Sequence, residues 1–338
     1  MSETVRMDLA EAIALCEQAA LAAGANKETA ASLAKSVVAA EAKGVRSVGL
    51  AHFLDYLDAL ESGRIDGAAE PVVTRPALAV FMSDARGGIA HTAFDRSFHD
   101  LAKSARIFGV AIFAQKNAFT CGELGYFTGR LASEGLVAFG ATNGPALLAG
   151  AGSAKPVYCT NPMSFAAPVE GGVPLVIDQS SSETAFVSLR KAAEEGREIP
   201  TGWAVDSRGK PTTDPAAAMK GALLAFGGNR GANVALMVEV LAAGLTGANW
   251  SLDAPSFTQG AESPGTGLFL LAIEPKLIDP DFAARLKAQL DRLAFDHRVH
   301  VPGVSRGKAG MLAKALGLDV PADIVRRIAA YADRHLPG

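Results

Sequence analysis

Apolar residues repeat at helical spacing around residue 50. The residues on this apolar face are Leu50, Phe53, Leu54, Leu57 and Leu60. Steps of three and four predict an amphipathic helix over 46–60. Residues 8–62 hold three such patterns, and in the second Asn26 is the expected N-cap and Gly44 the expected C-terminal glycine. The opening of the chain is therefore predicted to be all-helical.

The spacing changes near residue 70, where short apolar runs begin to alternate with helical stretches. The runs that predict strands are 109–115, 135–142, 173–179 and 267–275. The helical stretches are 96–107, 122–134, 214–225 and 231–245. From residue 280 the pattern is helical again, over 280–295 and 321–336, with a glycine-rich basic turn between the two helices. We predict an α/β protein in which 1–70 and 280–338 form a helical domain around a mixed α/β domain over 71–279.

Composition and charge are those of an ordinary globular protein. The 338 residues are 49% hydrophobic and 20% charged, which excludes disorder as the main state. A formal net charge of −3 provides no basic stripe for phosphates, so no nucleic-acid partner is expected. The N-terminus lacks the features of a signal peptide, and no run approaches the roughly 18 apolar residues of a membrane helix. Cys16, Cys121 and Cys159 show no paired spacing, so we expect a cytoplasmic protein without disulfides or a membrane partner.

Most familiar chemical signatures are missing from the sequence. "GAGSAK" at 150–155 and "GGNRGA" at 227–232 both fail the G-x-G-x-x-G spacing, so a standard Rossmann site is not predicted. No G-x-S-x-G elbow, H-E-x-x-H helix or Walker loop is present. His297 and His300 have no cysteine nearby, and no metal site is expected.

Ser47 and His52 are polar residues at the start of the predicted helix over 46–60. Ser47 is a candidate N-cap, whose oxygen would accept a backbone N–H of the first turn. His52 follows one turn later and is either a solvated histidine or part of a reactive site. The residues alone leave both alternatives open.

Several glycine-rich polar segments resemble those of a known family. The segments are "SVGLAHFLDYLDALESGRI" (47–65), "KNAFTCGELGYFTGRLASEGLVAFGATNGPALLAG" (116–150), "CTNPMSFAAP" (159–168), "VIDQSSS" (176–182), the stretch 199–247 and "VPGVSRGKAG" (301–310). Together they resemble the malate/L-lactate dehydrogenase-like oxidoreductases. The phrases "FTCGELGY", "TNGPALLAG", "VYCTNP" and "GWAVD" resemble the branch that reduces Δ1-pyrroline-2-carboxylate and Δ1-piperideine-2-carboxylate to L-proline and L-pipecolate. The resemblance implies an NAD(P)-binding α/β fold distinct from the Rossmann fold, and a homodimer.

The family's catalytic motif is only partly present. Ser47 matches the serine of a Ser-His-Gly motif, but Val48 occupies the histidine position. His52 stands where the family commonly has an arginine that contacts the substrate carboxylate, and 48 and 52 share a face if the helix has begun by then. Thr120 stands where a second family histidine often lies. The resemblance thus implies Ser47 and His52 as catalytic residues, and His52 and Thr160 as contacts for the substrate.

The missing histidine favours one reaction over another. Reduction of a ketone leaves a basic alkoxide, and a positioned proton donor contributes about 10²- to 10⁴-fold to its rate. Reduction of a protonated cyclic imine leaves a neutral amine, so no acid is needed at the moment of hydride transfer. We therefore expect an NAD(P)H-dependent imine reductase, an oxidoreductase acting on CH–NH groups. A 2-keto acid reductase or 2-hydroxy acid dehydrogenase and a non-catalytic nucleotide-binding relative remain the alternatives.

Cofactor contacts are expected where the family motifs match. The residues are Thr120, Cys121, Gly122, Glu123, Leu124, Asp178, Gln179, Ser180, Asn229, Arg230, Gly303, Arg306 and Lys308. The first five would place backbone N–H groups at a helix N-terminus, which binds phosphate well. Arg306 and Lys308, two cations expected in a glycine turn, would favour NADPH over NADH as the cofactor. The alternatives are an ordinary turn, a strand-end acid at Asp178 and a solvated basic loop.

Overall fold

The largest element of the structure is a seven-stranded sheet. The computed structural model describes residues 3–335. The sheet has the order β2-β3-β4-β12-β5-β8-β9. Its strands are β2 (Val72–Ala77), β3 (Val80–Asp84), β4 (Val110–Ala118), β12 (Thr266–Ile273), β5 (Val137–Thr142), β8 (Met163–Ala167) and β9 (Leu175–Gln179). Among these strands β3 and β4 pair in parallel and the other neighbours are antiparallel. The four strands predicted from apolar runs are confirmed as β4, β5, β9 and β12.

Helices cover both faces of this sheet. The helices on one face are α4 (Ala90–Phe108) and α5 (Leu124–Ser133), and on the other face α8 (Asn229–Glu239) with the π-helical turn Val240–Gly244. Successive residues of β12 show the alternation, because Leu270 belongs to the core beneath α4 and α5 and Phe269 to the core beneath α8. The predicted mixed α/β architecture is confirmed.

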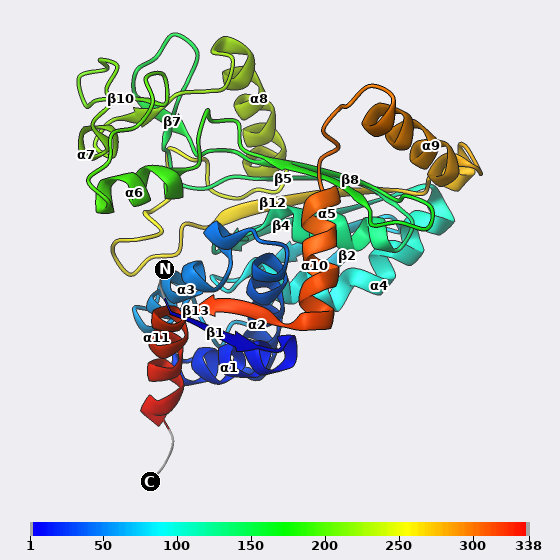
Figure 1. The fold of residues 1–338 in the computed structure, drawn as a ribbon, viewed down its shortest axis with the longest axis horizontal. Coiled ribbons are helices and arrows are strands. Elements are labelled where there is room, and N and C mark those ends of the chain that lie inside the picture. Colours follow the sequence, from blue (N-terminus) through cyan, green and yellow to red (C-terminus); the bar gives the residue numbers. More distant parts are fainter. Residues whose placement is uncertain (1–2, 336–338) are drawn as a thin grey trace.

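A helical lobe lies below the sheet (Figure 1). It contains α1 (Leu9–Ala22), α2 (Lys27–Ala42), α3 (Leu50–Glu61), α11 (Ala322–Ala332) and the two-stranded sheet of β1 (Thr4–Met7) and β13 (Leu318–Pro321). The side chain of Asn26 accepts a hydrogen bond from Thr29 N at 2.8 Å, and Gly44 has a φ of 75° just past the end of α2. The predicted cap and C-terminal glycine of the second helix are both confirmed.

A smaller sheet forms a separate cluster at the upper left of Figure 1. Its elements are β10 (Ala204–Val205), β11 (Ala222–Leu223), β6 (Leu148–Ala149), β7 (Pro156–Tyr158), α6 (Phe186–Glu194) and α7 (Pro215–Ala218). Strands of two or three residues are too short to give an apolar pattern, and the sequence did not predict this unit. The helix predicted over 214–225 is wrong, because α7 ends at Ala218. A Cβ on Gly221 would lie 2.0 Å from the carbonyl oxygen of Val205, so the chain needs glycine where it turns into β11.

Within the described residues, three α-helices follow β12 near the C-terminus. They are α9 (Phe282–Phe295), α10 (Val304–Leu316) and α11. The predicted glycine-rich basic turn is therefore wrong, because residues 304–316 are helical. Gly307 allows α10 to pack closely against Val173, because a Cβ on Gly307 would lie 2.7 Å from a methyl group of Val173. None of the helices described over residues 3–335 is long and apolar enough to cross a membrane.

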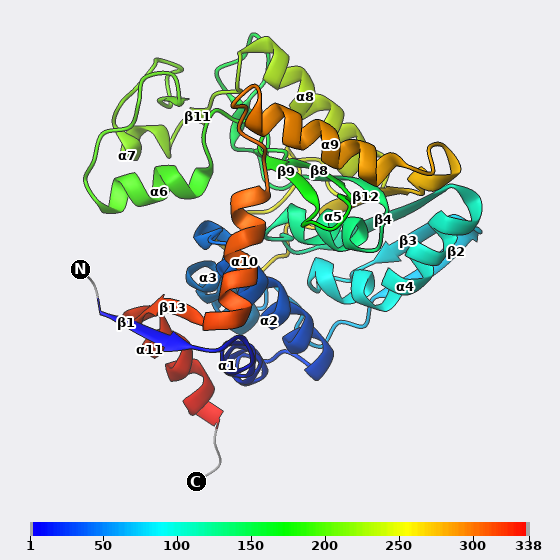
Figure 2. The same ribbon diagram turned by 45° about the vertical axis from the view of Figure 1, so that its right-hand side comes forward.

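The C-terminal helices do not all join the helical lobe. α10 contacts α2 and α11 contacts α1, whereas α9 lies well apart from α1–α3 (Figures 1 and 2). A hydrogen bond from Glu170 N to the carbonyl of Ala283 ties α9 to the β8–β9 connection. The predicted boundaries at residues 70 and 280 stay a prediction, and residues 336–338 lie outside the described part of the chain.

Candidate functional site

The start of α3 differs from the sequence expectation. The helix begins at Leu50, and Ser47 lies exposed in the 3₁₀ turn Arg46–Val48 without a capping hydrogen bond. The Leu50 N–H is instead capped by the carboxylate of Glu41, 3.0 Å away. The prediction that Ser47 caps the helix is therefore wrong. Val48 precedes the helix, so the condition under which positions 48 and 52 would share a helical face is not met.

His52 lies within a small polar cluster on α3. Its Nδ1 is 2.8 Å from Oδ2 of Asp55, and the same oxygen accepts a hydrogen bond from Nη2 of Arg190 at 3.0 Å. The imidazole packs edge-on against Tyr56, with ring centroids 5.1 Å apart. The Tyr56 hydroxyl donates to the carbonyl of Thr120 at 3.0 Å. His52 therefore lies beside the loop that the resemblance assigns to the cofactor.

The loop from Thr120 to Leu124 joins β4 to α5. Gly122 has a φ of 65°, and a Cβ there would lie 3.2 Å from the Tyr56 hydroxyl. Cys121 is buried, and burial raises the pKa of its thiol to about 12, so it packs as a small apolar group rather than a nucleophile. α5 then begins at Leu124 with Glu123 in the N-cap position. The glycine allows the loop and α3 to approach closely.

The N-terminus of α5 already holds an anionic group of the same chain. The Gly125 N–H donates to Oδ2 of Asp178 at 2.7 Å. Burial raises the pKa of Asp178 to about 6, with a further contribution from Glu123, although the Gly125 hydrogen bond, Arg306 and Lys43 act in the opposite direction. The Gly125 N–H at this helix N-terminus, which was expected to help bind a phosphate, therefore already binds the carboxylate of Asp178. A phosphate at this place would have to be held by side-chain cations.

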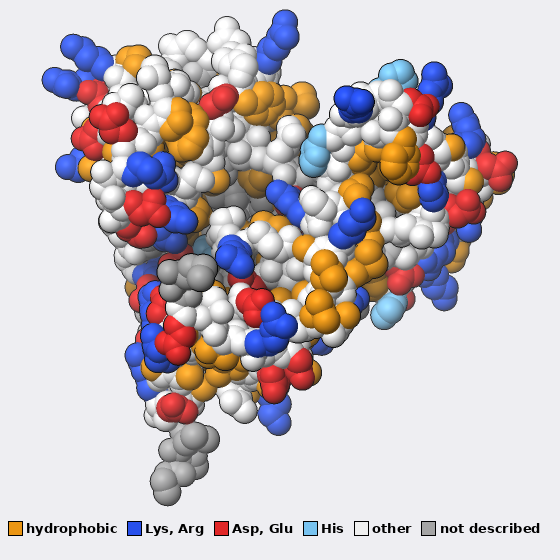
Figure 3. All heavy atoms as spheres, viewed as in Figure 1, with side chains coloured by type: hydrophobic (Ala, Val, Ile, Leu, Met, Phe, Trp, Pro, Cys, Tyr) orange, Lys and Arg blue, Asp and Glu red, His pale blue; other side chains and the backbone are white. Residues whose placement is uncertain are grey.

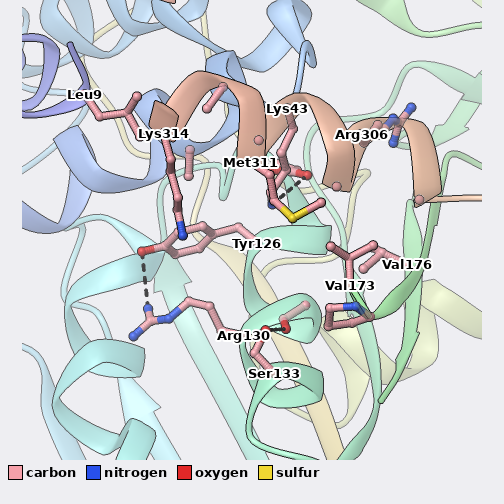
Figure 4. A pocket seen from close by; sticks show the side chains of 18 residues that line it. Leu9, Lys43, Tyr126, Arg130, Ser133, Val173, Val176, Arg306, Met311 and Lys314 are labelled. Carbon is pink, nitrogen blue, oxygen red and sulfur yellow. Dashed lines mark hydrogen bonds and ion pairs between the residues drawn. The ribbon is translucent and has the colours of Figure 1, made fainter. Parts of the chain in front are cut away.

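Those cations line a cavity of about 350 Å³ between α2, α5, β9 and α10 (Figure 4). The charged residues in its wall are Lys43, Glu123, Arg130, Arg306 and Lys314. Lys43 Nζ lies 3.1 Å from Glu123 Oε2, and Lys314 extends from α10 toward Tyr126. Gly303 has a φ of 81°, and a Cβ on it would lie 2.8 Å from Val176 N, so glycine brings the start of α10 against β9. Lys308 is exposed and is not among the lining residues, so Lys314 rather than Lys308 is the second α10 cation here.

A buried hydrogen-bond network supports the loop that carries Thr160. Asn161, with a φ of 37°, donates through Nδ2 to Oε2 of Glu239 at 2.7 Å and to the carbonyl of Ala235 at 2.8 Å. Ser251 donates to Glu239 through both its N–H and its hydroxyl, and its Oγ accepts from Cys159 N at 3.0 Å. The carbonyl of Thr160 accepts from Ser181 N at 2.8 Å. The Thr160 loop is thus joined to the segment that begins at Ser180, directly after Gln179 at the end of β9.

Asn229 and Arg230 occupy a different place from the other predicted cofactor residues. Both lie in the first turn of α8, not in a turn before it as the sequence suggested. Asn229 lines a second cavity, of about 380 Å³, whose wall contains five glycines and Glu183 as its charged residue. The lining glycines are Gly150, Gly152, Gly202, Gly227 and Gly228. Arg230 is exposed and outside this wall.

The predicted residues therefore fall into groups. His52 lies beside Thr120, Cys121 and Gly122. Glu123, Gly303 and Arg306 line the charged cavity, while Leu124 and Asp178 lie outside its wall, at the N-terminus of α5. Thr160 is bonded to Ser181, the neighbour of Ser180. A hollow in the middle of the molecule, with Lys and Arg side chains beside it, is visible in Figure 3. The sequence reading missed Lys43, Asp55, Arg190, Glu239 and Lys314. Only Asp55 carried a local signal, because a carboxylate three residues after a histidine on a helix lies on the same face.

Comparison with known proteins gives one consistent family. A family model described as malate/L-lactate dehydrogenase matches residues 7–329. The (2R)-3-sulfolactate dehydrogenase (NADP(+)) of Chromohalobacter salexigens is 36% identical over 96% of this chain and 98% of that protein. The Δ1-pyrroline-2-carboxylate/Δ1-piperideine-2-carboxylate reductase of Pseudomonas putida is 34% identical over 94% of each chain.

A solved structure agrees with these sequence relatives. The crystal structure of Δ1-piperideine-2-carboxylate reductase from Pseudomonas syringae pvar. tomato superposes with a TM-score of 0.93 at 33% identity. The match covers 97% of this chain and 100% of that one. The relatives thus carry two chemistries, an imine reduction and a hydroxy-acid oxidation, on one fold.

Proposed function

Because this chain belongs to the malate/L-lactate dehydrogenase family of oxidoreductases, we propose that it reduces a cyclic imino acid with NADPH. The substrate would be Δ1-pyrroline-2-carboxylate or Δ1-piperideine-2-carboxylate, and the product L-proline or L-pipecolate. The observation that carries this choice is Val48, which leaves no imidazole at the position of the family's proton donor. An iminium substrate needs no donor at the moment of hydride transfer, whereas a ketone does.

The charged cavity supports NADPH as the cofactor, with NADH as the alternative. Lys43, Arg306 and Lys314 offer three cations around one space, which suits the phosphate groups of a dinucleotide, and the 2′-phosphate in particular. Asp178, Gln179 and Ser180 would line the nicotinamide side, beside the loop of Thr120 to Leu124. The relative from Chromohalobacter salexigens carries NADP(+) in its name. When bound, the cofactor supplies a hydride to the substrate.

The roles of the chain's own residues follow from the charges of the substrate. The hydride and its electron pair would join the iminium carbon, and the former C=N π pair would become the lone pair of a neutral amine that keeps its proton. Thr160 and Ser47 would contact the planar imino acid, and His52 would stand at its polar edge. The protein's task is then to hold a flat, charged ring against the nicotinamide and to exclude water.

A second candidate is a 2-hydroxy acid dehydrogenase acting on a keto acid in the reverse direction. The sulfolactate dehydrogenase relative, at 36% identity over nearly the full length of both chains, favours it. In this case His52 would have to exchange a proton with the substrate oxygen. A nucleotide-binding protein without activity is the third alternative, which the assay below addresses.

We also propose a type of cofactor-binding fold and a homodimeric assembly for this chain. The mostly antiparallel sheet differs from the parallel sheet of a doubly wound dinucleotide fold, so we assign NADPH to a fold distinct from the Rossmann type. An exposed apolar strip on α8 and the segment after it fits a homodimer contact. Its residues are Leu236, Met237, Val240, Leu245, Trp250 and Leu252. Light scattering on the purified chain tests the dimer.

The function is tested by the rate of NADPH oxidation with four substrates side by side. These are the five- and six-membered cyclic imino acids, pyruvate and oxaloacetate. We expect the imino acids to exceed the keto acids in kcat/KM by at least tenfold. A preference for keto acids would favour the second candidate. No turnover of any of them, with NADPH still bound, would favour the third.

A further inference from the structure

We propose that Asp55 and Arg190 complete the substrate site around His52. Asp55 is a positioning residue that fixes the imidazole with its proton on Nδ1, and Arg190 binds the substrate carboxylate. The roles toward substrate rest on the proposed function, whereas the state of His52 can be tested without it.

The geometry joins two distant parts of the chain at one oxygen atom. Asp55 Oδ2 is 2.8 Å from His52 Nδ1 and 3.0 Å from Arg190 Nη2. His52 and Asp55 lie on α3, and Arg190 lies on α6 in the cluster around the small sheet. The side chains of His52 and Arg190 are 17% and 32% exposed, so both are largely shielded yet open to a ligand on one side. Tyr56 links the cluster to the Thr120 carbonyl and hence to the proposed cofactor loop.

The charge state of Asp55 determines which nitrogen of His52 holds a proton. Burial raises the pKa of Asp55, but hydrogen bonds from His52 and Arg190 outweigh this effect, and the net pKa is lowered. An ionised carboxylate can only accept hydrogen bonds, so Nδ1 of His52 must be the donor. The neutral imidazole then presents the lone pair of Nε2, and only the imidazolium has an N–H there.

This proton arrangement gives His52 a definite partner in an imine substrate. A neutral His52 cannot donate to the substrate carboxylate, contrary to the simplest reading of its sequence position. The Nε2 lone pair of His52 can accept a hydrogen bond from the N–H of a cyclic iminium ion. Because only the protonated substrate carries this N–H, the contact favours the protonated, reactive form of the substrate. Among the described residues, Asp55 on α3 is the charged group that hydrogen-bonds to His52, and Arg190 on α6 bonds the same Asp55 oxygen.

The carboxylate of the substrate then needs a separate cation, and Arg190 is placed to provide it. A guanidinium carries five N–H donors in a planar fork. The contacts described for Arg190 use Nη2 alone, toward Asp55. The remaining donors can bind a second carboxylate while the pair with Asp55 persists. In the substrate, the imine nitrogen and the carboxylate are attached to the same carbon, so they lie close together. Their proposed partners, His52 and Arg190, also lie close together, because both bind the same oxygen of Asp55.

The first experiment reads the state of His52 directly. Two-dimensional ¹H–¹⁵N spectra of the imidazoles, with His52 assigned through the His52→Gln variant, report which nitrogen is protonated at pH 8. We expect the Nδ1-protonated tautomer in the wild type and a mixture in Asp55→Ala. The matched control on the same helix is Glu61→Ala, which removes an exposed ion pair with Arg334 and should leave the tautomer unchanged. A wild-type imidazole protonated on Nε2 would overturn the role of Asp55.

The second experiment separates binding from chemistry. Arg190→Gln should raise KM for the imino acid by 10- to 100-fold and leave kcat within about threefold, whereas Asp55→Ala should lower kcat by tenfold or more. Lys191→Gln is the control, because Lys191 is the exposed neighbour of Arg190 on α6 and pairs with Glu195. If no substrate is turned over, the proposed function fails, and titration with L-proline and L-pipecolate then tests Arg190 by the shift of the His52 signals. Equal affinities in wild type and Arg190→Gln, or no binding by the wild type, would overturn the role of Arg190.

Discussion

Two carboxylates near the candidate site have opposite surroundings. Glu239 is 3% exposed and accepts hydrogen bonds from Asn161 Nδ2, Ser251 N and Ser251 Oγ at 2.6–2.8 Å. Asp178 accepts one from Gly125 N, lies beside Glu123, and has a pKa raised to about 6. The first carboxylate is surrounded by donors and stabilises a loop. The second has few donors, which is typical of groups whose charge serves function at a cost in stability.

The largest loss of stability is expected when the well-bonded carboxylate, Glu239, is removed. Glu239→Ala leaves the amide of Asn161 and the N–H and hydroxyl of Ser251 without their shared acceptor in a buried place. We expect a loss of about 3 kcal/mol in the free energy of unfolding, measured by urea denaturation. Glu239→Gln is the control, since it keeps an acceptor oxygen and should lose less. A change below about 1 kcal/mol in Glu239→Ala would show that the network is not a source of stability.

The opposite result is expected for the other carboxylate. Asp178→Asn keeps an acceptor for Gly125 N and removes a charge that the fold disfavours. A pKa raised from 3.8 to about 6 means that the wild type loses stability as pH rises through about 6. At pH 8 the asparagine variant should therefore be more stable by about 3 kcal/mol, with no difference at pH 3. Melting temperatures measured from pH 3 to pH 8 test this, and a variant less stable than wild type at pH 8 contradicts it.

The cations that line the charged cavity should matter for binding rather than for folding. Lys314→Met should weaken NADPH binding by about tenfold, or about 1.4 kcal/mol, because one charge-assisted contact is lost. Lys308→Met is its matched control, on the same helix but outside the cavity, and should bind NADPH within twofold of wild type. Isothermal titration calorimetry measures both. Equal losses in the two variants would mean that the cavity of Lys43, Arg306 and Lys314 does not hold the phosphate.

The smallest effect is expected at Ser47, near the start of α3. Glu41 caps α3 through Leu50 N, a role that the sequence suggested for Ser47. Ser47→Ala should therefore change the free energy of unfolding by less than about 0.5 kcal/mol, well below the ~1 kcal/mol typical of a lost N-cap. A larger loss in thermal denaturation would contradict the structure at this helix start. A loss of kcat/KM at unchanged stability would support the proposed contact of Ser47 with substrate.

What the sequence could predict depended on how local each signal is. The apolar periodicity of 46–60 and the runs that became β4 and β12 are local, and they gave the right elements. Gly303 and Gly307 resembled turn glycines, because sequence does not distinguish a glycine that bends the chain from one that lets a helix approach a strand. Arg190 and Glu239 had no local signal at all. Their partners, Asp55 and Asn161, are more than 70 residues away, so only the fold brings them together.

The pairing of β1 with β13 has a consequence for how the chain is made. Thr4 faces Pro321 and Met7 faces Leu318, so the first strand finds its partner only when almost the whole chain exists. The central sheet can form earlier, because β12 ends at Ile273. During synthesis the helical lobe is therefore completed late, and the part of α1 that packs against α11 stays uncovered until α11 has been made. Contacts of such long sequence separation slow folding, and we expect the last slow phase of refolding to be the closure of this lobe.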